Sequence, residues 1–266
     1  MASIDDVVKQ AKKAKRKSRN KKSAAEINSD KVTDISYSKT RIINVDNEIL
    51  TNNRVIAQNK EDPRSTPFHM LRTKVLRELR DNDWNSIAIS APTPGAGKSL
   101  VTVNLAMSIA METNQTVLIV DMDLRKPSIH KYFSFEPEYG LQDFIDGNAS
   151  VEDIMINPGI DRLVIMPGRK RVLNSSEQLS SPMLRTLTEE LKNKYESRVI
   201  LYDLPPLLVS DDVMAFLPNV DSSLLVIESG QNTKEEIEAS IAMLEQKPLL
   251  GTILNKELKA PKLYIY

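Results

Sequence analysis

The feature that most constrains the fold is a short glycine-bearing loop between a strand pattern and a helical pattern. Residues 86–90 predict a buried strand, residues 91–99 form the loop, and an apolar helical pattern covers residues 98–111. Gly95 and Gly97 allow a tight turn that directs backbone N–H groups inward, and the following helix adds the positive end of its dipole. This order predicts an α/β fold whose loop binds phosphate.

The end of this loop carries the residue types of a P-loop, the phosphate-binding loop of many ATPases and kinases. In a P-loop the lysine reaches the β- and γ-phosphates and the next hydroxyl ligates Mg²⁺, which assigns these roles to Lys98 and Ser99. The usual pattern opens with a glycine where this chain has Pro92, and the alternative is an incidental turn. The flanking strand and helix favour the P-loop, so ATP and Mg²⁺ are the expected cofactors. The expected nucleotide-binding residues are Pro94, Gly95, Ala96, Gly97, Lys98, Ser99 and Leu100.

Short apolar runs alternate with helical patterns through most of the chain. Strands are predicted at residues 86–90, 116–120, 162–166, 198–202, 223–227 and 249–254, and helices at residues 67–80, 98–111, 181–195 and 234–245. Continuous apolar strands between helices indicate parallel strands that are buried on both faces. The expected fold class is α/β, a P-loop NTPase with a mostly parallel central sheet and helices on both faces.

The charge distribution separates three regions. Residues 1–65 predict a basic, largely flexible extension, residues 66–256 the nucleotide-binding domain, and residues 257–266 a short tail that bears tyrosines. Residues 1–24 carry nine Lys or Arg, with apolar residues near helical spacing between them. This segment fits either a basic amphipathic helix on an anionic membrane surface or a solvated tail. Charge is spread evenly over the domain, so no nucleic-acid partner is expected.

The composition limits the location and the kinds of site. The 266 residues include no cysteine, which excludes a disulfide framework and a thiolate metal site. No run approaches the ~20 apolar residues that span a bilayer. No apolar segment follows the basic N-terminus as it does in a secretory signal. The cytoplasm is the expected location.

Aspartates directly follow two of the predicted strands. Asp121 and Asp123 come after the second strand, and Asp203 comes after the fourth. The carboxyl ends of parallel strands meet at one edge of a sheet, where P-loop enzymes hold Mg²⁺ and its waters. Ser99, Asp121 and Asp203 are the expected metal-site residues, although each aspartate has the alternative of capping a helix or turn. Arg125 either neutralises transferred charge or forms a structural ion pair. The candidate catalytic residues are Lys98, Asp121, Asp123 and Arg125, with Asp121 suited to act as a base toward a hydroxyl.

Three segments together resemble the bacterial tyrosine kinases of capsule and exopolysaccharide loci, in particular the cytoplasmic kinase chains of the CpsD/CapB type. These kinases are relatives of the MinD/ParA ATPases. The segments are Pro-Gly-Ala-Gly-Lys-Ser at 94–99, Val-Asp-Met-Asp-Leu-Arg-Lys-Pro at 120–127 and Tyr-Asp-Leu-Pro-Pro at 202–206. The similarity runs from about residue 67 to residue 256. Thr93 stands where the MinD/ParA branch has its signature lysine.

The resemblance implies an ATP-dependent protein-tyrosine kinase that phosphorylates its own C-terminal tail, usually between neighbouring subunits. It implies Tyr264 and Tyr266 as the acceptors. The family also implies an activating partner, a membrane polysaccharide co-polymerase, and a location at the inner face of the plasma membrane. The residues that match the family's motifs are Lys98 and Ser99 of Walker A, Asp121 and Asp123 of Walker A′, and Asp203 of Walker B.

The chain departs from the family pattern in two places. Other members carry a dense tyrosine cluster where this tail has two tyrosines. The family's oligomerising Glu-x-x-Arg-x-x-Arg aligns with Thr66, His69 and Arg72, which leaves a dimer, a ring or a monomer open. Two other functions are weighed: a MinD/ParA-like ATPase switch without tyrosine phosphorylation, and a structural adaptor. His69 and His130 have no ligand-like spacing and are not expected to be catalytic.

Overall fold

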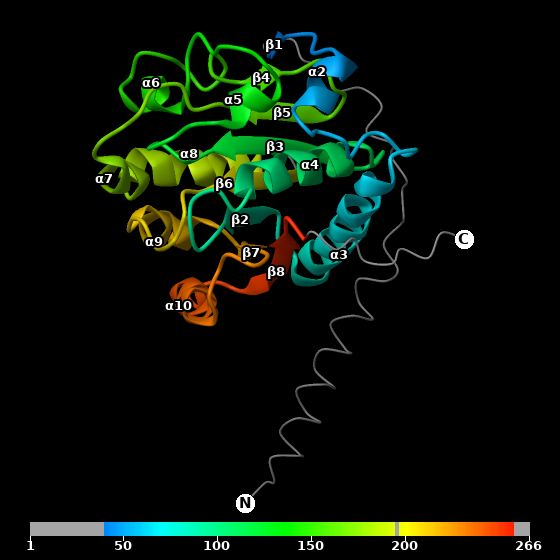
Figure 1. Ribbon diagram of the computed structural model, residues 1–266. Helices are drawn as coiled ribbons and strands as arrows, with labels where there is room; N and C mark the ends of the chain where they lie inside the picture. The colour runs from blue at the N-terminus through cyan, green and yellow to red at the C-terminus, as the bar shows by residue number, and fades with distance from the viewer. Residues whose placement is uncertain (1–39, 195–196, 258–266) are drawn as a thin grey trace, which may run out of the picture. The chain divides into compact units, whose positions relative to one another are not determined.

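Eight strands form one sheet in the order β1-β4-β5-β3-β6-β2-β7-β8 in this computed structural model, which describes residues 40–194 and 197–257 (Figure 1). The paired strands run parallel except β4 and β5, which are antiparallel. The strands are β1 (Arg41–Ile42), β2 (Ser86–Ser90), β3 (Thr116–Asp121), β4 (Ile156–Asn157), β5 (Leu163–Met166), β6 (Arg198–Asp203), β7 (Ser222–Glu228) and β8 (Leu249–Asn255).

Helices cover both faces of this sheet (Figure 1), and the predicted P-loop NTPase fold class is confirmed. The four predicted helices are present, as α3, α4, α8 and α10. The helices are α2 (Asn47–Asn52), α3 (Thr66–Asn82), α4 (Lys98–Ala110), α5 (Ile129–Tyr132), α6 (Leu141–Ile145), α7 (Ser175–Leu179), α8 (Pro182–Asn193), α9 (Asp212–Phe216) and α10 (Lys234–Leu244), with 3₁₀ turns η1 (Pro63–Ser65) and η2 (Leu217–Asn219).

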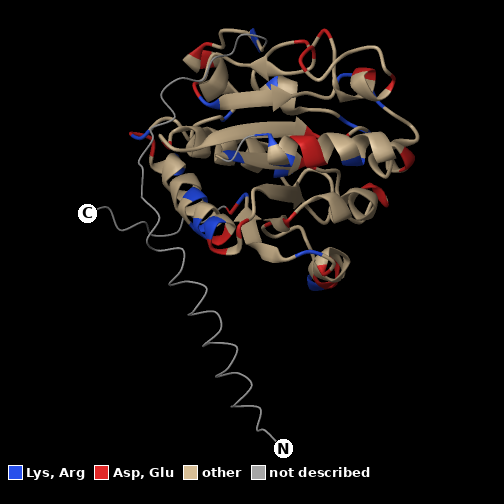
Figure 2. Cartoon of the chain, turned by 180° about the vertical axis from the view of Figure 1, so that it is seen from behind, with Lys and Arg blue, Asp and Glu red and all other residues tan. Residues whose placement is uncertain are grey.

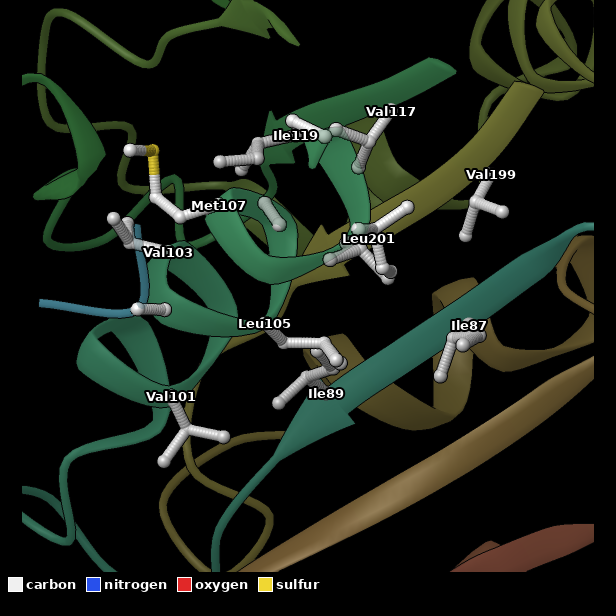
Figure 3. Packing of buried hydrophobic residues seen from close by; sticks show 14 of the residues in the cluster. Ile87, Ile89, Val101, Val103, Leu105, Met107, Val117, Ile119, Val199 and Leu201 are labelled. Atoms are coloured by element: carbon white, nitrogen blue, oxygen red, sulfur yellow. The ribbon is translucent and has the colours of Figure 1, made fainter. Parts of the chain in front are cut away.

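The central strands are buried along their whole length, as their continuous apolar sequences require. On one face, α3 and α4 pack on the sheet, and Figure 3 shows Val101 and Leu105 of α4 beside Ile89 and Leu201 of the strands. A second apolar cluster fills the opposite face under α8, α9 and the end of α10. Each face therefore has a separate core, as expected of strands whose alternate side chains point to opposite sides.

The packed region reaches back into the segment that the sequence placed in the N-terminal extension. Leu50 of α2 and the residues Val55 and Ala57 are buried in the core on the α4 face. Asn104 of α4 holds this segment, because its Oδ1 accepts hydrogen bonds from the N–H groups of Ile56 and Ala57 at 2.8 and 3.1 Å. The low apolar content of residues 1–65 as a whole concealed these few anchoring side chains.

Several sequence predictions concern residues outside those the structure describes. They include the basic amphipathic pattern in residues 1–24, the end of the helix predicted to residue 195, and the tyrosines Tyr264 and Tyr266. Across residues 40–194 and 197–257, no helix has the length and apolar character needed to cross a membrane.

Candidate active site

The loop between β2 and α4 has the backbone that its two central glycines permit. Gly95 and Gly97 both have φ of +89°, in the left-handed region that side chains with a Cβ avoid. A Cβ on Gly97 would also lie 2.2 Å from Nδ2 of Asn255, so a larger residue cannot fit there. Helix α4 begins at Lys98, with Gly97 as its N-terminal cap. Residues 94–100 thus form a loop and a first helical turn whose N–H groups suit an anion.

Lys98 and Ser99 meet the predicted acidic residues at the carboxyl edge of the sheet. Nζ of Lys98 lies 2.8 Å from a carboxylate oxygen of Asp123 and 3.6 Å from one of Asp203. Ser99 Oγ donates a hydrogen bond to Asp203 at 2.6 Å. Burial alone would lower the pKa of Lys98, but the carboxylates of Asp203 and Asp123 outweigh this effect and raise it. The lysine is therefore a permanent positive charge inside the protein.

Asp121 lies at the end of β3, paired in the sheet with Asp203 at the end of β6, and both side chains are fully buried. One Asp121 oxygen accepts hydrogen bonds from the N–H groups of Ser128 and Ile129 at 2.8 and 3.0 Å. Its other oxygen, Oδ1, has no hydrogen-bond partner among the described residues. Burial, with the nearby Asp203 carboxylate, raises the pKa of Asp121 to about 7.

Asp203 lies in the same buried environment, which disfavours its ionised form. Burial raises the pKa of Asp203, although the charge of Lys98 and the hydrogen bond from Ser99 oppose the shift. Two carboxyl groups in one buried site favour a cation or a proton between them, because neither can be ionised there without compensation. The unpartnered Asp121 oxygen and the Ser99 hydroxyl are the oxygen ligands that Mg²⁺ prefers.

A protein-only metal cage is not part of this site. The described residues contain no group of three or more His, Cys, Asp or Glu side chains that is arranged to hold a metal ion. Mg²⁺ commonly takes one or two protein ligands and completes its shell with water and substrate phosphates. The residues present therefore fit an Mg²⁺ ion that arrives with a nucleotide.

Arg125 forms the ion pair that the sequence left as one of its two alternatives. Its guanidinium donates to both carboxylate oxygens of Asp212 on α9, with a closest nitrogen–oxygen distance of 3.1 Å. The Asp212 side chain is fully buried, whereas that of Arg125 is 37% exposed. The pair links the loop that follows β3 to helix α9.

Three residues of the site escaped the sequence analysis. Ser128 Oγ lies 3.1 Å from Ser99 Oγ, and Asn255 Nδ2 donates to the Ala96 carbonyl at 2.8 Å. Asn232 donates to the hydroxyl of Thr93 in the first half of the loop at 2.8 Å. Asn255 had the same signal as the aspartates, since it is a polar residue directly after an apolar strand. The other two come from loops that carry no pattern.

Tyr132 also belongs to the surroundings of the site. It is the last residue of α5, the short helix that follows Ser128. Burial raises the pKa of Tyr132, with contributions of opposite sign from Asp203 and Lys98. Of the two histidines, His69 bonds to the Ala57 carbonyl at 2.8 Å, and burial lowers the pKa of His130.

The chain is similar in sequence to a known family and to bacterial tyrosine-protein kinases. The pattern of the AAA domain family matches residues 84–259. Tyrosine-protein kinase ptk of Acinetobacter johnsonii is 30% identical over 200 residues, which cover 74% of this chain and 27% of that protein. Tyrosine-protein kinase YwqD of Bacillus subtilis is 31% identical over 194 residues, which cover 72% of this chain and 80% of that protein.

A solved structure with a similar fold is also that of a bacterial tyrosine kinase. The kinase domain of the Escherichia coli tyrosine kinase ETK has a TM-score of 0.71 at 27% identity, over 87% of this chain and 95% of that domain. The chain spans about a quarter of the length of several curated relatives, 26 to 27% in three of them. The region that matches the AAA domain family, residues 84–259, contains the loop, Lys98 and the acidic strand ends.

Proposed function

Because the chain belongs to the bacterial tyrosine kinases of the AAA domain family, we propose that it is an ATP-dependent protein-tyrosine autokinase. Its proposed role is to regulate the polymerisation or export of exopolysaccharide or capsule. The single observation that carries this proposal is the buried cluster of Lys98, Ser99, Asp121 and Asp203 beside the P-loop. A cluster of this kind suits a triphosphate with Mg²⁺, because Lys98 can pair with phosphate oxygens while Ser99 and the carboxylates can hold Mg²⁺ or its waters.

Lys98 and the loop are proposed to bind the nucleotide phosphates. The N–H groups of residues 95–100 would face the anion, and Lys98 would exchange its contact with Asp123 for the β- and γ-phosphates. Ser99 and the two buried aspartates Asp121 and Asp203 are the residues that would hold Mg²⁺ or its waters. When bound, Mg²⁺ would supply positive charge to the phosphate oxygens.

Asp121 is proposed to accept the proton of the attacking tyrosine. Its pKa of about 7 allows it to be ionised at neutral pH and to hold a proton once it receives one. In the transfer, the bond between the γ-phosphorus and the bridging oxygen of ADP breaks as the bond to the tyrosine oxygen forms. The hydroxyl proton passes to Asp121, and ADP leaves. Arg125 is proposed to position the loop that follows Asp121 and contains Asp123, through its ion pair with Asp212.

The proposed acceptors are Tyr264 and Tyr266, and the proposed partner is a membrane polysaccharide co-polymerase. The names of curated relatives such as the putative tyrosine-protein kinases CapB and EpsB support this setting. The nine basic residues within 1–24 support a place at an anionic membrane surface on the cytoplasmic side. Self-association would bring the tail of one copy to the site of another, and no contact with nucleic acid is proposed.

The alternative function is a nucleotide-dependent assembly switch. Its support is that the tail has only two tyrosines, and that the P-loop and both acidic strand ends would also serve hydrolysis by water. The two functions differ in where the γ-phosphate goes, to tyrosine or to water.

The test is incubation of the purified chain with γ-labelled ATP and Mg²⁺, beside Lys98→Met and a chain truncated before Tyr264. Lys126→Met is the control, because Lys126 is an exposed lysine in the loop after β3. The proposal predicts labelled phosphotyrosine that disappears in the first two variants and persists in the control. ATP hydrolysis without labelled tyrosine, with the partner's cytoplasmic segment also present, would support the switch instead.

A further inference from the structure

An open groove runs between helix α3 and strand β8, at the edge of the sheet opposite β1 (Figure 1). Its volume is about 970 Å³. Phe68 and Leu71 line it from α3, and Leu250 and Leu254 line it from β8. Leu254 is 59% exposed, although it lies in a strand. The groove therefore exposes apolar side chains beside polar ones.

Strand β8 offers hydrogen-bonding groups along this groove. Among residues 40–194 and 197–257 it pairs only with β7, so its other edge carries backbone N–H and C=O groups that have no strand partner in this part of the chain. Its sequence, Leu-Leu-Gly-Thr-Ile-Leu-Asn, contains none of the charges or prolines that commonly protect an edge strand. A Cβ built on Gly251 meets no atom within 4 Å, which leaves room for a large side chain from a neighbouring segment. The groove therefore fits an extended peptide that adds to the sheet.

We propose that residues 258–266 of this chain, which lie outside the described residues, dock in the groove as an antiparallel partner of β8. They follow directly after Lys256 and Glu257, which line the groove. Leu263 and Ile265, which lie on one face of an extended strand, supply apolar side chains for its walls. A segment tethered at the rim binds at a high effective concentration, so even a few apolar contacts favour docking.

The last described residues have the conformation that a reversal of the chain requires. Lys256 has φ of +58°, a left-handed conformation typical of tight turns. Its ammonium pairs with Glu228 at 2.9 Å, and Ser229 donates to Glu257 at 2.8 Å, so the turn is fixed to the end of β7. Nine residues at ~3.3 Å each span ~30 Å, which exceeds the ~23 Å of the seven residues of β8.

Two other occupants fit the groove less well. Residues 1–39 join the domain next to β1, at the opposite edge of the sheet, and carry many lysines. Figure 2 shows Lys and Arg along α3, and the groove is lined by Arg64, Lys74 and Lys256 against Glu78 and Glu257, so it has no excess of negative charge to attract them. A second copy that extended the sheet would do so through its own β8. The α3 helix of that copy lies beside its β8 and would have to enter the same space as the α3 helix of the first copy.

Docking would withdraw the proposed acceptors from the phosphate site. The site lies at the carboxyl ends of the parallel strands, and a segment that runs back along β8 carries Tyr264 toward the amino end. The docked tail is thus a resting state, and phosphorylation in a neighbouring copy requires its release. This consequence rests on the proposed function, whereas docking itself does not.

The test is amide hydrogen exchange of β8, measured by mass spectrometry in the full chain and in a chain that ends at Glu257. No nucleotide is added, so the result does not depend on kinase activity. Docking predicts that β8 amides exchange about tenfold more slowly in the full chain, because a mostly docked tail covers them. Exchange in the buried strand β2 reports whether each variant is folded.

A matched pair of substitutions identifies the groove as the docking surface. Leu254→Lys should remove most of the tail-dependent protection, whereas Ile42→Lys should not, since Ile42 is equally exposed at 57% but lies in β1 at the opposite edge. Equal exchange in the full and truncated chains would overturn the proposal. So would protection that rises with protein concentration, which indicates a second copy, or that is lost when residues 1–39 are deleted.

Discussion

The carboxyl edge of the central strands buries charge, whereas the free edge of β8 exposes apolar side chains. At the first, Asp121 and Asp203 are fully buried, and Lys98 is only 9% exposed. At the second, Leu254 is 59% exposed on a strand with no charged residue. Both arrangements are unfavourable in isolation, because buried charge needs compensation and exposed apolar surface needs cover. Each region therefore indicates the chemistry of what it binds.

The two sites depend on different interactions, polar contacts in the central site and apolar side chains in the groove. The central site is held by hydrogen bonds and ion pairs at short range, such as the 2.6 Å contact from Ser99 to Asp203. The groove is lined largely by apolar side chains of α3 and β8, with charged residues such as Lys256 and Glu257 beside them. A change in the central site should alter chemistry and the response to pH, whereas a change in the groove should leave the folded core as it is.

The largest expected effect is on phosphoryl transfer. Asp121→Asn removes the proposed base but keeps a side chain of the same shape, so labelled phosphotyrosine should fall at least ~100-fold. Binding of a fluorescent ATP analogue should persist in the same variant. Asp146→Asn, an exposed aspartate at the end of α6, should retain full labelling. Normal labelling in Asp121→Asn would remove this residue from the mechanism.

The next effect is on the pH dependence of stability without nucleotide. Between the ordinary aspartate pKa of 3.8 and about 7, the folded chain holds a proton on Asp121 that the unfolded chain has released. Stability from this group is therefore full at low pH and is lost as the pH rises through 7. The slope is at most ~1.4 kcal/mol per pH unit. Urea unfolding between about pH 5 and about pH 8 should show a decline that Asp121→Asn reduces.

Asp143 provides the opposite case for this measurement. A hydrogen bond from Arg169 lowers the pKa of Asp143, so its contribution is present above the ordinary aspartate pKa and is lost only at lower pH. Asp143→Asn should lower stability without changing the slope between about pH 5 and about pH 8. An unchanged slope in Asp121→Asn would mean that this carboxyl does not hold a proton in the folded state.

A smaller effect, on the free energy of unfolding, is expected from the ion pair between Arg125 and Asp212 beside the central site. Arg125→Ala leaves the buried Asp212 without its ion pair, and the partial exposure of Arg125 limits the cost to about 1–2 kcal/mol of unfolding free energy. Arg185→Ala breaks an exposed pair with Glu189 and should cost less than about 0.5 kcal/mol. Thermal unfolding of the two variants compares the stability lost with the Arg125–Asp212 pair and with the exposed Arg185–Glu189 pair.

The smallest effect is expected in the groove. Leu254→Lys should change the unfolding free energy by less than about 0.5 kcal/mol, because the side chain is mostly exposed. Leu201→Ala, in the core of β6, should cost about 2–5 kcal/mol. A large loss in Leu254→Lys would show that the groove is part of the core and would weaken the contrast between the two regions.

The fold and the centre of the site could be predicted because both have short-range sequence signals. Apolar runs at residues 86–90 and 198–202 became buried neighbouring strands, and the polar residues after them met at one edge. Parallel strands make this outcome general, since their carboxyl ends lie together whatever the loops do. Lys98 and Asp203 are over a hundred residues apart, yet two local patterns were enough to bring them together.

The remaining features depend on contacts that no local pattern records. The anchoring of residues 50–57 comes from Asn104 and a few apolar side chains in an otherwise polar stretch. Arg125 had two plausible roles in the sequence, and its ion pair with Asp212 on α9 has no local sequence signal. The groove beside β8 could not be predicted, because it results from the part of the apolar face of α3 that the sheet does not cover.

The most direct test of the central claim is mass mapping of the full chain after incubation with ATP and Mg²⁺, beside a Tyr264→Phe/Tyr266→Phe chain. The account predicts phosphate on Tyr264 or Tyr266, with the total phosphotyrosine largely lost in the double variant and the P-loop site unchanged. ATP consumption equal in both chains, with no phosphate on any tyrosine, would contradict it and identify a site that transfers phosphate to water.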